Sequence, residues 1–120
     1  MPVEEVLDEK FIGLDEATVG SLEAYIYLRS ARNGTAPRRG AEACRDFTDV
    51  IVAVAAGRGV ATCVESVREP WPGVTYIPLL GVPPAVNTII SLRRNRSPLV
   101  HAFLSTARAV MAVTTAGVPR

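Results

Sequence analysis

A chain of 120 residues, of which 48% are hydrophobic and 21% charged, has the composition of a single globular domain. A chain of this length buries on folding roughly 65% of the surface that it exposes when unfolded, which is enough for one core. The 13 basic and 12 acidic side chains leave a net charge of +1, and only 6% of the residues are aromatic. These values argue against a disordered chain and against a strongly basic or aromatic-rich nucleic-acid module.

The sequence opens without a secretory leader, and none of its apolar runs approaches the length needed to span a membrane. We therefore expect a cytoplasmic protein without membrane association. Two cysteines, Cys44 and Cys63, make no disulfide framework, so both are interpreted as small buried hydrophobic residues. The basic clusters at residues 38–39 and 93–96 are interpreted as solvated turns.

The first part of the chain alternates short strand and helix patterns. Apolar residues recur at helical spacing after Ser21, and Asn33-Gly34 is a strong helix stop because both residues tolerate the left-handed conformation. In chain order the pattern predicts a helical turn within residues 2–9, a strand at 10–14, a turn at 15–20, a helix at 21–33, a loop at 35–40 and a strand at 41–45.

Residues 46–57 carry two opposing signals. The β-branched residues at 50–52 favour a strand by intrinsic propensity. Asp46 is a good N-cap, Asp49 follows three residues later as in a capping box, and Gly57 suits the position after a helix. The capping signals favour a helix, and we predict one.

The second part of the chain continues the alternation. Ser97 followed by Pro98 is a typical helix start, and the apolar positions 100, 103, 104, 107 and 111 make the helix that follows amphipathic. The pattern predicts strands at 59–65, 74–80 and 86–93, a stiff corner at 81–84, this final helix, and a frayed tail from Thr114. Alternation of strands and helices predicts the α/β class with largely parallel strands.

Four ordered motifs in the second half are informative together. They are VAAGRG at residues 54–59, YIPL at 76–79, paired arginines at 93–94 and SP at 97–98. With this spacing the chain resembles the effector-binding domain of LysR-type bacterial transcription regulators, which have the fold of type 2 periplasmic binding proteins. The resemblance implies an incomplete Rossmann-like three-layer lobe. Residues 3–75 would be the second subdomain, and residues 76–113 would be the return crossover and the C-terminal part of the first.

The resemblance also implies a function. Such a domain senses a small-molecule effector, uses no cofactor and catalyses nothing. The family's N-terminal helix-turn-helix has no counterpart in this sequence, so we expect no direct contact of the chain with nucleic acid. The family pairs its effector domains, which implies a homo-oligomer, with exchange of the C-terminal strand and helix about the 81–84 corner as one route. The alternative is a free-standing protein, derived from the same lobe, that binds a small ligand or a partner.

Candidate ligand contacts follow from the same reading. In α/β domains small molecules bind at the carboxyl ends of strands, where N–H groups at helix starts can bind a carboxylate. Two such starts lie at residues 18–22 and 45–48, although Asp46 at the second counts against an anion there. The resemblance implies Ser21, Leu22, Phe47 and Thr88 as ligand contacts, and Thr48 is added from the second helix start. Each of them is equally compatible with a core or capping role.

Catalytic, metal and phosphate sites have weaker support. Cys44 as a nucleophile with His101 as its base is the enzyme hypothesis, but His101 falls on the polar side of its predicted helix. One histidine and two separated cysteines do not have zinc-ligand spacing. The glycines at 57 and 59 follow a helix, whereas a phosphate-binding loop precedes one. We therefore predict neither an enzyme nor a metal site.

Overall fold

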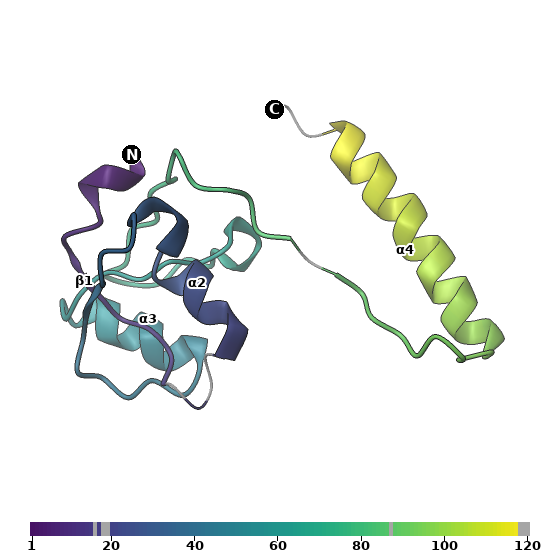
Figure 1. Cartoon of the computed structure of the whole chain (residues 1–120), viewed down its shortest axis with the longest axis horizontal. Coiled ribbons are helices and arrows are strands. Elements are labelled where there is room, and N and C mark those ends of the chain that lie inside the picture. The colour runs from purple at the N-terminus through teal and green to yellow at the C-terminus, as the bar shows by residue number, and fades with distance from the viewer. Residues whose placement is uncertain (16, 18–19, 87, 118–120) are drawn as a thin grey trace. The chain divides into compact units, whose positions relative to one another are not determined.

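The computed structural model describes residues 1–15, 17, 20–86 and 88–117. It divides into a first unit, Met1–Ala85, and a second unit that begins at Val86, and each is described here by itself. The elements, labelled in Figure 1 where there is room, are the 3-10 helices η1 (Val3–Glu5), η2 (Gly20–Leu22), η3 (Arg29–Ala31) and η4 (Glu65–Val67), the strands β1 (Lys10–Phe11) and β2 (Arg38–Arg39), and the α-helices α2 (Glu23–Ile26), α3 (Phe47–Ala55) and α4 (Pro98–Gly117).

Strand β1 lies between two parallel neighbours. On one side it pairs with β2 through Phe11↔Arg39, and on the other side Phe11 pairs with Val60. The N–H of Ile12 donates to the carbonyl of Val60 at 2.7 Å, and the N–H of Val60 donates to the carbonyl of Lys10 at 2.9 Å. A Cβ on Gly59 would collide with that carbonyl of Lys10, so only glycine permits this approach. The expected parallel pairing is confirmed.

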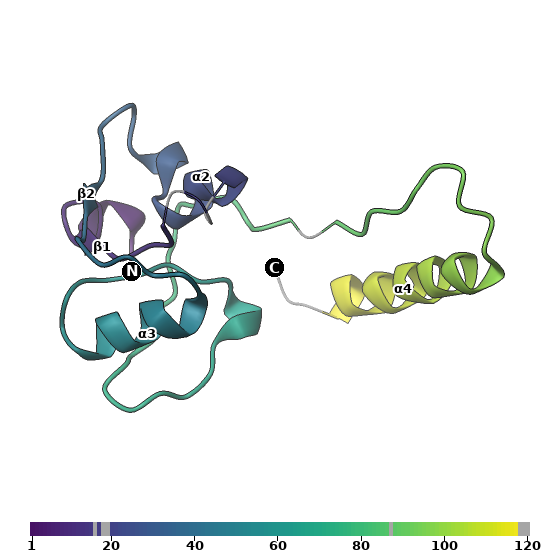
Figure 2. The same ribbon diagram turned by 90° about the horizontal axis from the view of Figure 1, so that it is seen from below.

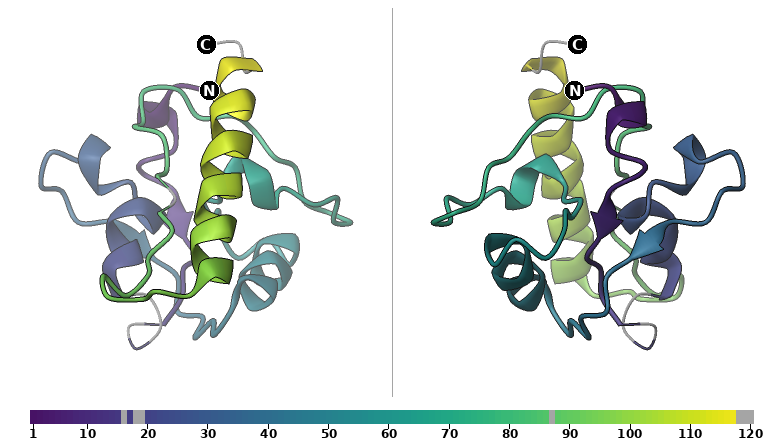
Figure 3. Two further views of the ribbon diagram at one scale, coloured as in Figure 1. Left: turned by 90° about the vertical axis from the view of Figure 1, so that its right-hand side faces the viewer. Right: turned by 90° about the vertical axis from the view of Figure 1, so that its left-hand side faces the viewer.

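Two apolar clusters cover the opposite faces of these strands. Successive residues of a strand point to opposite faces, and Phe11 and Ile12 accordingly belong to different clusters. Figures 2 and 3 show α2 and α3 on opposite sides of the strands. The Phe11 cluster contains Val3, Val6, Tyr27 and Leu28, and the Ile12 cluster contains Cys44, Val50 and Ala53. The first unit is therefore an α/β unit with helices on both faces of parallel strands.

The continuous helix predicted at 21–33 is wrong. The segment forms η2, α2 and η3 instead, with a break at Leu28, whose φ of 54° is left-handed. Tyr27 and Leu28 are both buried in the Phe11 cluster, and the break allows the two neighbours to enter it together. The predicted stop is confirmed, because Asn33 and Gly34 have φ of 49° and 84°.

Helix α3 confirms the capping argument. The side chain of Asp46 accepts a hydrogen bond from the N–H of Asp49 at 2.9 Å, and the Asp49 carboxylate accepts one from the N–H of Arg45 at 3.0 Å. Gly57 follows the helix with a φ of 72°. The caps prevail over the β-branched propensity because Val50 and Ile51 are buried in the helical conformation.

Most of the predicted strands form single bridges instead of regular strands. Within 41–45 only Cys44 bridges, to Leu14, and the regular strand β2 lies earlier, in the predicted loop. Val60 and Leu80 are likewise the bridging residues of their predicted strands, and Leu80 pairs with Pro2. From the pair Phe11↔Arg39 to the pair Leu14↔Cys44, the second segment advances two residues more than the first. This change of register interrupts the hydrogen-bonded ladder. The strand predicted at 86–93 does not form in its described residues, where Ile90 is 89% exposed.

The second unit contains the predicted final helix as α4, which Figure 3 shows as one continuous helix. Its start is confirmed, since the carbonyl of Ser97 accepts from the N–H of His101 at 3.2 Å. The tail predicted from Thr114 is wrong up to Gly117, because the helix continues to that residue. Leu104 is only partly buried, and Phe103 is 62% exposed. Half of the turn predicted at 15–20, residues 16, 18 and 19, lies outside the described residues.

Asp46→Ala is expected to lower the free energy of unfolding by about 1 kcal/mol, because it removes the acceptor for the N–H of Asp49. The measurement is urea denaturation at pH 7. Glu69→Ala removes an exposed carboxylate outside the helices, and this control should change the free energy by less than about 0.5 kcal/mol. Equal effects of the two substitutions would show that Asp46 does not act as a cap.

Candidate functional site

The carboxyl ends of two neighbouring strand segments lie side by side. Leu14 bridges Cys44 in a parallel pair, and the N–H of Asp15 donates to the carbonyl of Cys44 at 2.8 Å. After Leu14 the chain continues toward η2, and after Cys44 it continues into α3. The two helix starts that the sequence nominates therefore follow adjacent strand ends, at what we call the carboxyl edge.

Four of the five candidate contacts follow this edge. Leu22 ends η2 and is 51% exposed, while Phe47 opens α3 and is 36% exposed. Thr48 is the next residue of α3 and is exposed. Ser21 lies within η2, but its side chain is outside what the structure describes. Leu22 and Phe47 are thus large apolar side chains that stay outside both core clusters.

The fifth candidate, Thr88, lies in the second unit and is exposed. Thr88 therefore belongs to a different unit from the other four candidates.

The start of α3 is acidic. Asp46 and Asp49 both accept backbone hydrogen bonds there, and Arg45 approaches the Asp49 carboxylate at 3.8 Å with a side chain that is 85% exposed. An exposed ion pair of this kind neutralises little charge in water. The positive end of the α3 dipole is therefore already matched by carboxylates of the chain itself.

Cys44 is buried beneath this edge, with 3% of its surface exposed, as predicted, whereas the prediction that Cys63 is buried is wrong, because Cys63 is exposed. Burial raises the pKa of the Cys44 thiol, and the carboxylates of Asp49, Glu42 and Asp46 raise the pKa further. The thiol is therefore protonated at neutral pH and is a poor nucleophile. His101, its proposed base, is exposed on α4 in the other unit. Within the described residues no group of three or more His, Cys, Asp or Glu side chains is placed to hold a metal ion.

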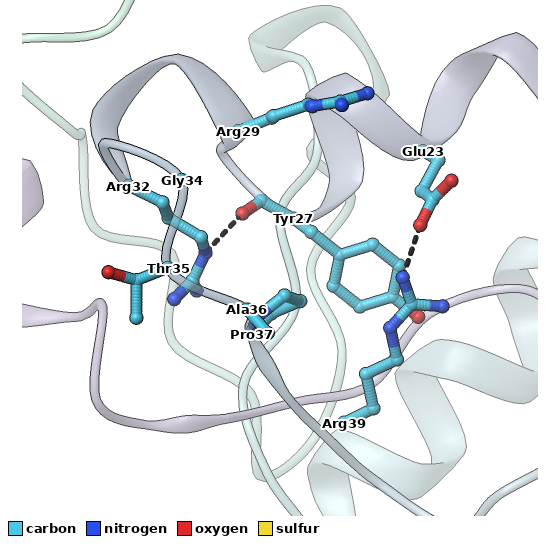
Figure 4. Close-up of a pocket in the computed structure, with 9 residues that line it drawn as sticks. All are labelled: Glu23, Tyr27, Arg29, Arg32, Gly34, Thr35, Ala36, Pro37 and Arg39. Atoms are coloured by element: carbon cyan, nitrogen blue, oxygen red, sulfur yellow. Dashed lines mark hydrogen bonds and ion pairs between the residues drawn. The ribbon is translucent and has the colours of Figure 1, made fainter.

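A cavity elsewhere in the first unit was missed by the sequence reasoning. This cavity of about 300 Å³ lies where η3 and the following loop lead into β2 (Figure 4). Three arginines line it, and the nearest sequence signal was the basic pair at 38–39, which was interpreted as a solvated turn. Its lining residues are Glu23, Tyr27, Arg29, Arg32, Gly34, Thr35, Ala36, Pro37 and Arg39.

Comparison with protein families identifies the class. Residues 1–112 match the model of the LysR substrate binding domain, so the chain belongs to this family. Neither the curated proteins nor the solved structures gave a significant match. The chain is thus an effector-sensing domain of a LysR-like regulator, and such domains are regulatory rather than catalytic. Among the described helices none combines the length and apolar character needed to cross a membrane.

The raised pKa of Cys44 predicts a pH dependence of stability. A thiol that binds its proton more tightly in the folded state stabilises that state below the ordinary pKa of 9.0, and the contribution is lost as pH rises through the raised value. Urea denaturation between pH 7 and 10, under reducing conditions, should show the unfolding free energy falling more steeply in the wild type than in Cys44→Ala. Cys63→Ala, which keeps Cys44, should retain most of the steep fall. Identical slopes for Cys44→Ala and the wild type would contradict the assignment.

Proposed function

We propose that the effector binds at the carboxyl edge, with Leu22 and Phe47 as apolar walls. The observation that carries this proposal is the exposure of both side chains at helix starts that follow adjacent strand ends. Ligands of open α/β sheets bind outside the carboxyl ends of the strands, where apolar side chains supply most of the contact area. The match of residues 1–112 to a substrate binding family supports a small-molecule site on this chain.

The polar contacts complete this proposal. The hydroxyl groups of Ser21 and Thr48 would orient the ligand, and Thr88 is included because the resemblance assigns it to the ligand site. For the effector we propose a small carboxylate. Asp46 and Asp49 already occupy the start of α3, so the carboxylate group would face the start of η2, near Ser21. The apolar body of the effector would then contact Leu22 and Phe47.

We further propose that the first unit is a Rossmann-like three-layer lobe, part of the type 2 periplasmic-binding-protein fold. The two clusters on opposite faces of parallel strands support this architecture. In this arrangement residues 3–75 form the second subdomain, and residues 76–113 form the return crossover and the end of the first. The division of the chain at Val86 supports a boundary in this region, although it falls after residues 76–85, of which Leu79 and Val82 pack against the Phe11 cluster within the first unit.

The setting we propose is the bacterial cytoplasm, where the free thiols of Cys44 and Cys63 would stay reduced. With a net charge of +1, the chain would not bind duplex DNA by itself. We also propose a homo-oligomer. Large apolar side chains are exposed in the second unit, and apolar surface of this kind is typically covered by a partner. They include Ile90 at 89%, Leu92 at 71%, Leu99 at 81% and Phe103 at 62% exposure.

The binding proposal predicts that Leu22→Ala and Phe47→Ala each weaken effector binding by about tenfold or more, because each removes a buried apolar contact with the ligand. A panel of small aliphatic and aromatic carboxylates, screened by thermal shift, supplies the ligand, and calorimetry measures its affinity. Val52→Ala is the matched control, since Val52 is 52% exposed on the same helix as Phe47 but away from its start.

Stability provides the second readout for these variants. Ile12 is 1% exposed, and Ile12→Ala should cost roughly 2–5 kcal/mol of unfolding free energy. Phe47→Ala should cost clearly less, because Phe47 lies outside the core. The carboxyl-edge assignment is wrong if Phe47→Ala is as destabilising as Ile12→Ala and leaves ligand affinity unchanged.

The oligomer proposal is tested by light scattering behind a sizing column at micromolar concentration. We expect a mass of at least twice the 12.8 kDa of one chain. Phe103→Glu should lower the mass, because it places a charge on exposed apolar surface of α4. Ser105→Glu adds the same charge at an exposed polar position of α4 and should leave the mass unchanged. A wild-type mass of one chain would rule out the assembly.

A further inference from the structure

Arg32 carries a buried positive charge without an acidic partner in the described structure. The residue is 6% exposed, and the ion pairs among the described residues involve Arg39, Arg45 and Arg58 instead. A guanidinium does not lose its proton in a protein, so burial cannot neutralise Arg32. An unpaired charge removed from water is costly, which makes the surroundings of Arg32 a place where a negative charge would be favourable.

The existing contacts of Arg32 satisfy only part of its guanidinium. Its Nε donates to the carbonyl of Tyr27 at 2.6 Å, and its Nη1 donates to the carbonyl of Leu7 at 2.8 Å. The guanidinium carbon lies 4.8 Å from the centre of the Phe11 ring, a cation–π contact. The remaining nitrogen, Nη2, is buried and has no hydrogen-bond partner. These contacts fix the position of the group but leave Nη2 without a hydrogen bond and the charge without an acidic partner.

The cavity beside Arg32 gathers further cationic and polar groups. Arg29 of η3 and Arg39 of β2 line it together with Thr35, as Figure 4 shows. Arg39 stacks over the Tyr27 ring at 4.3 Å and pairs with the carboxylate of Glu23, the sole acidic residue in the lining. Three arginines against one carboxylate leave the lining with an excess of two positive charges. The ring of Tyr27 holds the Arg39 guanidinium in place.

We propose that this cavity is an accessory site for a small oxyanion, either phosphate or the carboxylate of a small molecule. The excess positive charge of the lining arginines would hold the anion, and the hydroxyl of Thr35 would donate a hydrogen bond to it. Arginine suits this role because its planar fork matches the oxygens of carboxylate and phosphate groups. A volume of about 300 Å³ is at the lower end of ligand pockets, which fits a small anion.

This site is separate from the carboxyl edge. The two sites have no proposed contact in common. Residues 34–37 of the lining precede β2 in the parallel sheet, whereas the proposed effector contacts follow the carboxyl ends of the strands, although the lining also reaches Glu23, next to Leu22. The proposal of an accessory site can therefore be tested separately from the proposal of the effector site. An anion held there would link η3 to the segment that enters β2.

The test titrates the 120-residue chain with sodium phosphate and, separately, with sodium acetate, at constant ionic strength set by sodium chloride. Amide chemical shifts of residues 29–39 report binding. We expect a saturable response to at least one of the two anions, and the tighter one identifies the class. Arg29→Gln should weaken binding about threefold, the range for an exposed charge. Arg32→Lys, which keeps the charge but loses the fork, should weaken binding about tenfold.

Two controls keep the result interpretable. Arg68→Gln makes the same change of charge at an exposed position outside the cavity and should leave the affinity unchanged. Thr35→Val removes a lining hydroxyl, should weaken binding, and provides a readout if the Arg32 variant does not fold. The proposal is overturned if phosphate and acetate act no differently from chloride, or if Arg29→Gln and Arg68→Gln change the affinity equally.

Discussion

The first unit depends on two adjacent residues, Phe11 at the end of β1 and Ile12 directly after it. Phe11 is fully buried, Ile12 is 1% exposed, and the two side chains enter clusters on opposite faces of the strands. Phe11 also pairs with β2 on one side and with Val60 on the other. Two residues therefore organise both the neighbouring strands and the helical layers. A shift of this strand by one residue would exchange the two faces, because side chains alternate along a strand.

Signals confined to a few neighbouring residues were predicted correctly from the sequence. The caps of α3 at Asp46 and Asp49, the stop at Asn33-Gly34 and the start of α4 at Ser97 all depend on local hydrogen bonds and backbone preferences. Features that depend on distant partners were not predicted. The break at Leu28 arises from burial against residues far along the chain, and the strand boundaries depend on which backbone groups find partners.

The same division holds for the candidate sites. Leu22 and Phe47 were nominated from the family resemblance and fall in two helix starts that are visible in the sequence, and the structure places them after neighbouring strand ends. The arginine cavity had no such signal. Arg29, Arg32 and Arg39 are separated in sequence and share a cavity only because the chain turns back through residues 33–37 into β2. That turn, and the burial of Arg32 against Phe11, are tertiary effects.

The carboxyl ends and the amino ends of the strands, called here the carboxyl edge and the amino edge, differ in electrostatic character. At the carboxyl edge, the carboxylates of Asp46 and Asp49 already interact with the positive end of the α3 dipole. A ligand there would therefore gain more binding free energy from apolar contact than from charge. At the amino edge the excess of arginine leaves positive charge unmatched. If both proposals hold, the effector would be recognised mainly by apolar contact and the anion mainly by charge.

The break at Leu28 has a consequence for how the unit assembles. Helices η2, α2 and η3 have three, four and three residues, whereas an isolated helix needs about 12–15 residues to be even marginally stable in water. These turns therefore cannot act as a local folding nucleus. Their formation is tied to the docking of Tyr27 and Leu28 onto Phe11, so secondary and tertiary structure in this layer arise in a single cooperative step. Helix α4, with 20 residues, is under no such constraint.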